Sequence, residues 1–182
     1  MLESVPHAPR GDGMFRDGIA TADGPCCDSE DATDCMLSRD NVAMLAAGMA
    51  ESLPIRDAMI VSLVTGRSCD RRMMIEIASR PHSAGVRRRM SSMMIDAFHG
   101  AGPGPDPTRC TSGVTMLAQI ADAVPERWGV QPRAAIAYVL WWMDDDAAAL
   151  HALECLAEDD GCTLAGIVLS MVERGIRPAW CG

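Results

Sequence analysis

Apolar residues recur along most of the chain at the spacing of amphipathic helices. In the segment that follows Ser38 they fall at positions i, i+3, i+4, i+7 and i+8, on one face of a helix: Val42, Leu45, Ala46, Met49 and Ala50. Similar stripes continue, segment after segment, as far as Gly175. This pattern predicts an all-α protein of about eight helices that pack as a compact bundle.

Capping and helix-breaking residues indicate where the helices begin. They place the eight starts near residues 38, 54, 70, 83, 111, 132, 146 and 163. Thr111 or Ser112 is the expected cap of the fifth helix, and Pro132 is the expected opening residue of the sixth. The segment Met59–Thr65 is rich in β-branched residues, so a strand is an alternative there.

The best-packed part of the core is expected in the last third of the chain, because all the tryptophans lie there: Trp128, Trp141, Trp142 and Trp180. In the seventh helix the expected inward residues are Ala149, Leu153, Leu156 and Ala157. In the eighth helix they are Leu164, Ile167, Val168, Met171 and Val172.

The first 37 residues differ in composition from the rest of the chain. Proline, glycine and acidic residues are frequent there, and apolar neighbours are few. Such a stretch buries too little apolar surface to offset the entropy that ordering costs. We therefore expect a flexible acidic arm over residues 1–37 and one helical domain over residues 38–182.

Charge is unevenly distributed along the chain. The formal net charge is −9, and all 16 basic residues are arginine. Between Arg67 and Arg89 seven arginines stand against two acids, a local charge of +5, whereas Met143–Asp160 holds seven acids and no base. The candidate binding residues in the two segments are Arg71, Arg72, Arg87, Arg88 and Arg89, and Asp144, Asp145 and Asp146.

Three interpretations of these charged segments are open. They can be two solvated helix faces of one domain, with Asp144–Asp146 as cap and dipole partners of the next helix. They can meet across an interface with a second copy or with another protein. The arginines can also bind nucleic-acid phosphates, but the acidic net charge and the scarcity of aromatic residues nearby argue against it.

Several short motifs resemble those of a known family: Leu53–Ala58, Trp141–Ala149, Ala152–Glu154, Asp159–Asp160, Leu164–Ala165 and Gly175–Pro178. They resemble the C-terminal part of an actinobacterial family of unknown activity, domain of unknown function 4192. The pattern is also similar to one tetratricopeptide-type helical hairpin, which implies a helical binding surface. Asp144 stands where the family has glycine, and Gly161 where it has proline. The resemblance implies a helical fold and an actinobacterial or related host, and no catalytic residue.

Eight cysteines raise the question of a metal or redox site, although no C-x-x-C motif occurs. His151 and Cys155 are four residues apart on one helix face, Cys162 lies in the following turn, and Cys181 can supply a fourth ligand. The alternative is that Cys155 is a small core residue and His151 a partly exposed helix residue.

The sequence contains no familiar catalytic motif: it lacks G-x-S-x-G, H-E-x-x-H and any lysine for a phosphate loop. The longest apolar run, Ala134–Met143, is too short to span a bilayer, and no signal-peptide core is present. We expect a cytoplasmic, non-enzymatic protein without a cofactor that binds another protein or itself, and neither a membrane nor nucleic acid. The alternatives are a metal-binding or redox protein that uses His151, Cys155 and Cys162, and a nucleic-acid accessory factor that uses the arginines.

Overall fold

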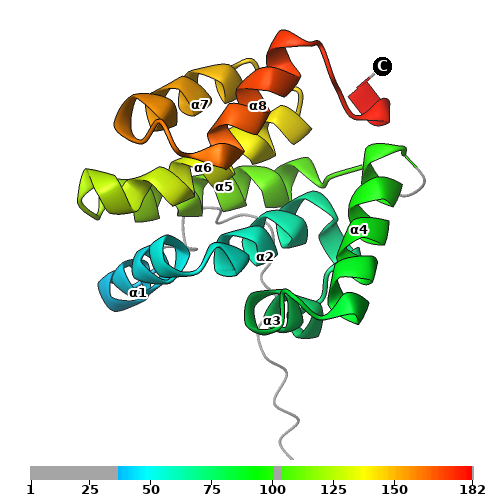
Figure 1. Cartoon of the computed structure of the whole chain (residues 1–182), viewed down its shortest axis with the longest axis horizontal. Coiled ribbons are helices and arrows are strands. Elements are labelled where there is room, and N and C mark those ends of the chain that lie inside the picture. The colour runs from blue at the N-terminus through cyan, green and yellow to red at the C-terminus, as the bar shows by residue number, and fades with distance from the viewer. Residues whose placement is uncertain (1–36, 101–103, 182) are drawn as a thin grey trace, which may run out of the picture. The chain divides into compact units, whose positions relative to one another are not determined.

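Eight α-helices and two short 3₁₀-helices make up the described part of the chain (Figure 1). The computed structural model describes residues 37–100 and 104–181, which contain no strand. The elements are α1 (Arg39–Glu51), α2 (Leu53–Val64), η1 (Gly66–Ser68), α3 (Arg71–Ser79), α4 (Ala84–Phe98), α5 (Pro107–Asp122), α6 (Glu126–Trp142), α7 (Ala147–Glu158), α8 (Thr163–Glu173) and η2 (Ala179–Cys181). The prediction of an all-α bundle of about eight helices is confirmed. The expected N-terminal arm, apart from Leu37, lies outside the described residues.

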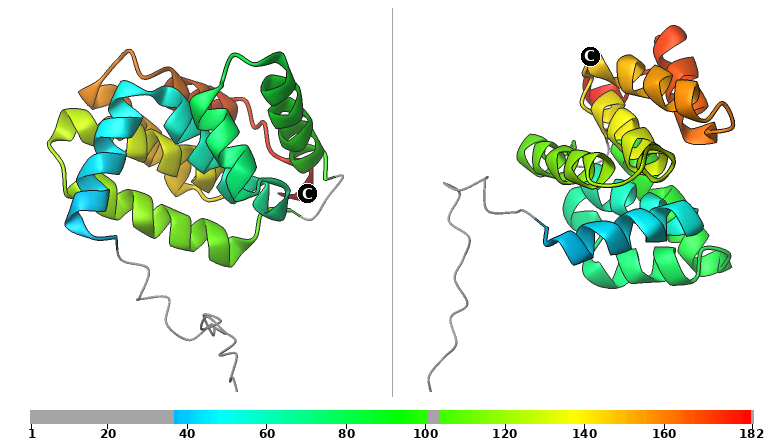
Figure 2. Two further views of the ribbon diagram at one scale, coloured as in Figure 1. Left: turned by 90° about the horizontal axis from the view of Figure 1, so that it is seen from below. Right: turned by 90° about the vertical axis from the view of Figure 1, so that its left-hand side faces the viewer.

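The helices form three layers, with α5 and α6 in the middle. The pair α7 and α8 lies on one side of this layer, and α1 and α2 lie on the other (Figures 1 and 2). Helix α3 packs mainly against α2, and α4 packs against both α3 and α2, at the edge of the bundle. Helix α6 contacts α1, α2, α5, α7 and α8, so it is the common partner of the other layers. None of the described helices is long and apolar enough to cross a bilayer.

Helix α6 contains the largest part of the core, because it is apolar on nearly all sides. Eleven of its residues are buried, as expected for a helix whose charged residues are confined to its first two turns. Phe98 at the end of α4 packs on Trp141 and Trp142, with ring centroids 6.2 and 6.1 Å away. The Trp141 Nε1 donates a hydrogen bond to the Ile176 carbonyl (2.9 Å), which attaches the segment after α8 to α6. The expected core around Trp141 and Trp142 is confirmed, whereas Trp128 and Trp180 are half-buried.

The segment Met59–Thr65, for which a strand is the alternative, is helical up to Val64. Every residue from Ala58 to Val64 is buried, because α2 is covered by α1, α3 and α6. Burial on several sides outweighs the lower helix propensity of β-branched residues.

Helix α5 begins at Pro107, earlier than the predicted cap at Thr111. The Asp106 Oδ1 accepts hydrogen bonds from the backbone N–H groups of Thr108 (3.0 Å) and Arg109 (3.3 Å). A capping aspartate followed by proline at the first helical position is a strong start signal. The proline-rich loop before α5 is therefore shorter than the sequence predicts.

Helix α6 also begins earlier, at Glu126, so that Pro132 lies inside it and does not open it. The turn before Pro132 packs closely on α5: a Cβ on Gly129 would lie 3.1 Å from the Ala121 carbonyl oxygen. Val130 in the same turn is buried. This packing outweighs the backbone hydrogen bond that an internal proline removes.

The inward face of α7 lies one residue away from the predicted one. Its buried residues are Ala148, Ala152 and Cys155. Leu153 is 51% exposed and Ala157 is exposed, while Ala149 and Leu156 are half-buried. Small residues on the inward face allow α7 to pack closely on α6 and leave the larger leucines outside.

Helix α8 buries fewer large residues than predicted. Leu164 and Val168 are buried as expected, and Met171 is half-buried. Ile167 and Val172, however, are 52% and 39% exposed. Helix α8 therefore presents apolar side chains to the outside.

The crossing of α2 and α5 at Gly113 is tight enough to test. A Cβ on Gly113 would lie 2.6 Å from the Leu63 Cδ1 and closer still to Cδ2, and Leu63 is buried. Gly113→Ala is expected to lower the free energy of unfolding by about 1–3 kcal/mol, measured by urea denaturation. The control is Gly166→Ala in α8, where a Cβ would meet no atom within 4 Å. It is expected to raise that free energy by up to about 1 kcal/mol. Equal stability of the two variants would contradict the close crossing.

Candidate functional site

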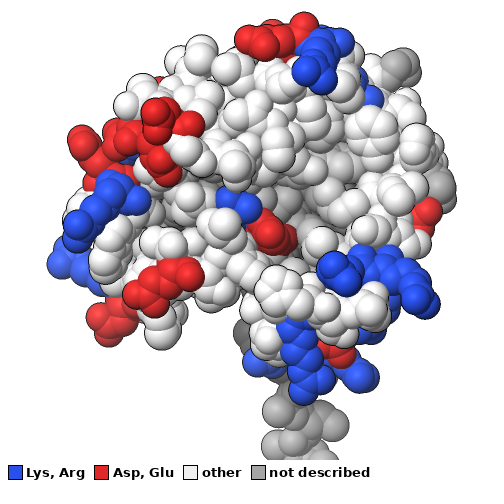
Figure 3. Space-filling view, viewed as in Figure 1, with Lys and Arg blue, Asp and Glu red and all other residues white. Residues whose placement is uncertain are grey.

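The five predicted arginines lie together on α3 and α4. Arg71 and Arg72 begin α3, and Arg87, Arg88 and Arg89 follow one another in α4. All five are exposed. Figure 3 shows basic side chains gathered over these two helices. We call these five residues the arginine face.

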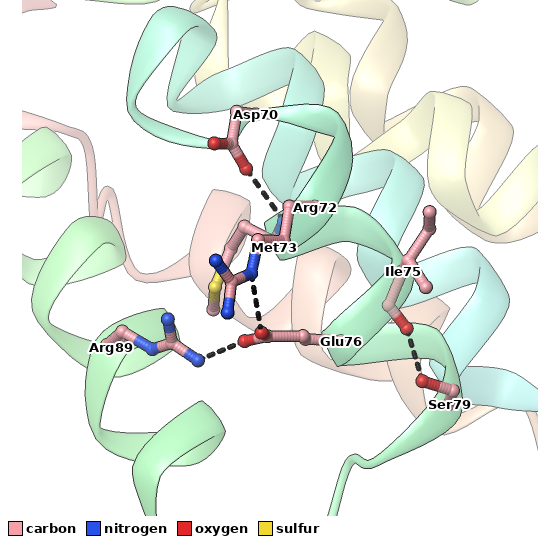
Figure 4. A network of polar contacts seen from close by, with 7 residues as sticks. All are labelled: Asp70, Arg72, Met73, Ile75, Glu76, Ser79 and Arg89. Carbon is pink, nitrogen blue, oxygen red and sulfur yellow. Dashed lines mark hydrogen bonds and ion pairs between the residues drawn. The ribbon is translucent and has the colours of Figure 1, made fainter.

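Glu76 of α3 connects the two helices of the arginine face. It accepts hydrogen bonds from the Arg72 Nε (3.2 Å) within α3 and from the Arg89 Nη2 on α4 (Figure 4). Desolvation raises the pKa of Glu76, but the hydrogen bonds from Arg89 and Arg72 outweigh it and hold this pKa below its ordinary value. Glu76 thus stays ionised and keeps two of the arginines in place.

The other three members of the arginine face have no internal counter-charge. Within residues 37–100 and 104–181, no ion pair is formed by Arg71, Arg87 or Arg88. The face combines five arginines with one bound carboxylate, which leaves a charge of +4. Such a surface attracts an acidic partner.

The three predicted aspartates do not meet the arginine face. Asp144 pairs with Arg177, with 2.8 Å between Oδ1 and Nη1, and its φ of 56° lies in the left-handed region that favours glycine. The Asp145 Oδ1 accepts a hydrogen bond from the Ala147 N–H (2.9 Å) and so caps α7, whereas Asp146 makes no capping bond. These aspartates serve the turn between α6 and α7.

A different set of acids lines a groove of about 820 Å³ between α5, α6 and α7. We call it the acidic groove. Its carboxylates come from Asp122 on α5, Glu126 on α6, and Glu154 and Glu158 on α7. Figure 3 shows acidic side chains gathered on the side of the molecule where these helices end, away from the arginine face.

The acidic groove contains one strong base and a histidine. The Arg133 Nη1 lies 3.5 Å from the Glu158 Oε1, and the His151 Nδ1 lies 3.3 Å from the Glu154 Oε2. Apart from His151, four carboxylates and one arginine leave a charge of −3. Ala118, Ala121 and Ile136 add apolar surface to the lining.

The predicted metal ligands are not assembled into a site. In the described part of the chain, no three histidine, cysteine, aspartate or glutamate side chains are placed so that they could hold a metal ion. His151 faces the acidic groove, while Cys155 is fully buried and its thiol donates to the Val130 carbonyl (3.6 Å). Cys162 is buried as the residue before α8. The geometry supports the alternative in which Cys155 is a small core residue.

No family model, no curated protein and no solved structure matches this chain. The resemblance to domain of unknown function 4192 therefore stays a prediction.

The sequence did not reveal the acidic groove as a unit. Glu154 and Glu158 lie in the predicted acidic segment, but Asp122 and Glu126 do not, and they join the groove only because α5 and α6 turn beside α7. The one available signal is the four-residue spacing of Glu154 and Glu158, which places both on one side of a helix.

The buried thiols produce a pH dependence of stability. Burial raises the pKa of Cys155 to about 12 and that of Cys110 to about 11, from an ordinary value of 9.0. Above pH 9 the unfolded chain therefore loses these protons while the folded chain keeps them. The free energy of unfolding is expected to fall with rising pH between about 9 and 11, by up to about 1.4 kcal/mol per pH unit for each thiol.

Urea denaturation at a series of pH values measures this slope. The double variant Cys110→Ala, Cys155→Ala is the control, because it removes both titrating groups and is expected to show a shallower decline between about pH 9 and 11. An unchanged slope in the double variant would show that the thiols do not cause the alkaline instability.

Proposed function

We propose that this chain is a non-enzymatic protein-interaction module that self-associates, with the arginine face of one copy against the acidic groove of the next. The observation that carries the proposal is the separation of the two charges. No ion pair joins the arginines of α3 and α4 to the acids of the groove within the described residues. Both surfaces therefore keep their charge available for a partner.

The two surfaces are complementary in chemistry as well as in sign. Carboxylates are the preferred partners of the guanidinium group, which presents several N–H donors in one plane. Ala118 and Ala157 in the groove, which are half-buried and exposed, give the methylene stems of inserted arginines an apolar surface to cover. In this proposal the arginine face binds the acidic groove and not Asp144–Asp146. Asp144 is already paired with Arg177, and Asp145 already accepts a hydrogen bond from the Ala147 N–H.

The contact proposed here joins two different surfaces of the same chain. Such head-to-tail contacts build rings when the rotation closes and open chains when it does not. Electrostatic attraction between exposed groups is screened by salt, since the Debye length falls from about 10 Å at 0.1 M to about 3 Å at 1 M. The proposal retains the expectation of a cytoplasmic protein that acts without a cofactor.

Sedimentation velocity of the full chain tests the proposal. Oligomers are expected at about 0.1 M salt and monomers at about 1 M salt. Two neutralised variants are each expected to stay monomeric at low salt: Arg87→Gln, Arg88→Gln on the arginine face, and Asp122→Asn, Glu154→Gln in the groove. An equal mixture of the two variants is expected to form a dimer and nothing larger, because one intact contact remains.

A third variant controls for net charge. Asp146→Asn, Asp160→Asn removes two exposed acids outside the groove lining and changes the net charge as much as the groove variant does. It is expected to oligomerise like the natural chain. A monomer at all salt concentrations, or oligomers that survive neutralisation of either surface, would contradict the proposal.

A further inference from the structure

A second concave site lies between α2, α4, α6 and α8, and it is separate from the charged surfaces described above. This cleft has a volume of about 300 Å³, and most of its lining is apolar. We call it the central cleft. Its walls are formed by Ile60 and Val61 of α2, Met90 and Met94 of α4, and Leu164 and Ile167 of α8. Apolar walls with a few polar groups are typical of sites that bind small organic groups.

The polar part of the central cleft is built around Arg56, which is only 7% exposed. Its Nε and Nη2 donate to the Asp57 Oδ1 (3.0 and 2.7 Å), and its Nη1 donates to the Gln131 Oε1 (2.6 Å). These bonds compensate for burial of the charge and connect α2 to α6. They use three of the five N–H groups that a guanidinium carries.

Two further groups in the cleft can bond a ligand. The Asp57 Oδ2 accepts no hydrogen bond within residues 37–100 and 104–181, and its side chain is 43% exposed. Burial raises the pKa of Tyr138; interaction with the Trp142 side chain opposes this and the nearby charge of Asp57 adds to it, so the pKa stays above its ordinary value and the phenol, protonated at neutral pH, can donate. The cleft thus offers both donors and acceptors beside its apolar walls.

The Arg56–Asp57 pair determines which polar group fits. A carboxylate would meet the negative charge of Asp57, and an ammonium would meet the positive charge of Arg56, so neither is favoured beside the pair. A neutral group that donates and accepts, such as an amide, satisfies Asp57 and Arg56 together. The walls fit an aliphatic group, and the flexible side chains of Met90 and Met94 can adjust to its shape.

We propose that the central cleft is a binding site for an aliphatic group attached to a neutral amide. The amide lies against Arg56, Asp57 and Tyr138, and the aliphatic part lies between α4 and α8 toward Ile167. Ile167 also lines an adjoining groove of about 470 Å³ along α8, together with Met171 and Ile176, so a longer ligand can continue there. The amide can belong to a free small molecule or to an apolar residue of a peptide.

Methyl NMR of the full chain with ¹³C-labelled methionine tests this site. The probes are hexanamide, hexanoate and hexylamine, which share one aliphatic chain and differ in the charge of the head group. Hexanamide is expected to shift the Met90 and Met94 signals and to bind at least about tenfold more tightly than the other two. Met49, which is fully buried, is the internal control and is expected not to shift.

Two variants test whether the Arg56–Asp57 pair selects against charged ligands. Each variant is expected to bind one of the charged probes more tightly than the natural chain does. Asp57→Asn leaves Arg56 as the only charge and is expected to bind hexanoate about tenfold more tightly than the natural chain does. Arg56→Met leaves Asp57 as the only charge and is expected to bind hexylamine about tenfold more tightly than the natural chain does. Unchanged Met49 signals in each variant show that the fold is retained.

The source of the amide is distinguished by comparing hexanamide with N-acetyl-leucine-N-methylamide, a blocked leucine residue that serves as the peptide unit and has one amide on each side. Tighter binding of the peptide unit assigns the site to a protein segment, and tighter binding of hexanamide assigns it to a small molecule. Equal binding of the three head groups, shifts of methionines outside the cleft, or no shift at all would overturn the proposal. None of these outcomes depends on self-association, because the titrations are made at about 1 M salt.

Discussion

The architecture depends on one constraint, which is that α6 has no polar face from Ala134 onward. Ala134–Met143 is an uninterrupted apolar run, and a helix of this kind is stable in water only when other helices cover it on every side. Helices α1, α2, α5, α7 and α8 supply that cover. The three-layer arrangement, the inward alanines of α7 and the aromatic contact with Phe98 all follow from the need to enclose α6.

The charged surfaces follow from the same constraint. Helices α3 and α4 make few contacts with α6. Their solvent-facing surfaces can therefore carry arginines. Asp122 and Glu158 stand at the ends of α5 and α7, which do cover it, and Glu126 is the first residue of α6 itself; at all three positions the chain returns to solvent. The core thus keeps the opposite charges apart. The central cleft lies where the neighbouring helices leave part of α6, at Tyr138, open to the cleft. Beside it, the buried Arg56 of α2 donates a hydrogen bond to Gln131 of α6.

Local signals in the sequence predicted much of this fold. Asp70 caps α3 as expected, and Ser38 caps α1, whose start was predicted near residue 38. Each accepts a hydrogen bond from a backbone N–H three residues later. In the stripe predicted for α1, Val42, Ala46 and Met49 are buried. Leu45 is half-buried, and Ala50 is exposed. What failed was the choice between neighbouring faces of α7, because Leu153 is more apolar than Ala152 and only the closeness of α6 decides in favour of alanine.

The sites were less predictable than the fold, because each is made by several helices. The acidic groove needs Asp122 beside Glu154, and the central cleft needs Arg56 beside Tyr138, and these pairs are far apart in sequence. Arg56 and Asp57 have one local signal: they are the two charged residues of the segment from Pro54 to Val64, in which Ser62 is the one other polar residue.

The central claim of this account is that the arginine face of one copy contacts the acidic groove of another. Cross-linking in an equal mixture of ¹⁴N- and ¹⁵N-labelled chains, with a photoreactive residue in place of Arg88, tests it most directly. The account predicts cross-links between light and heavy copies that join position 88 to peptides of α5, α6 or α7 that line the groove. Cross-links from position 88 to α3 or α4 of the other copy, or cross-links confined to one copy, would contradict it.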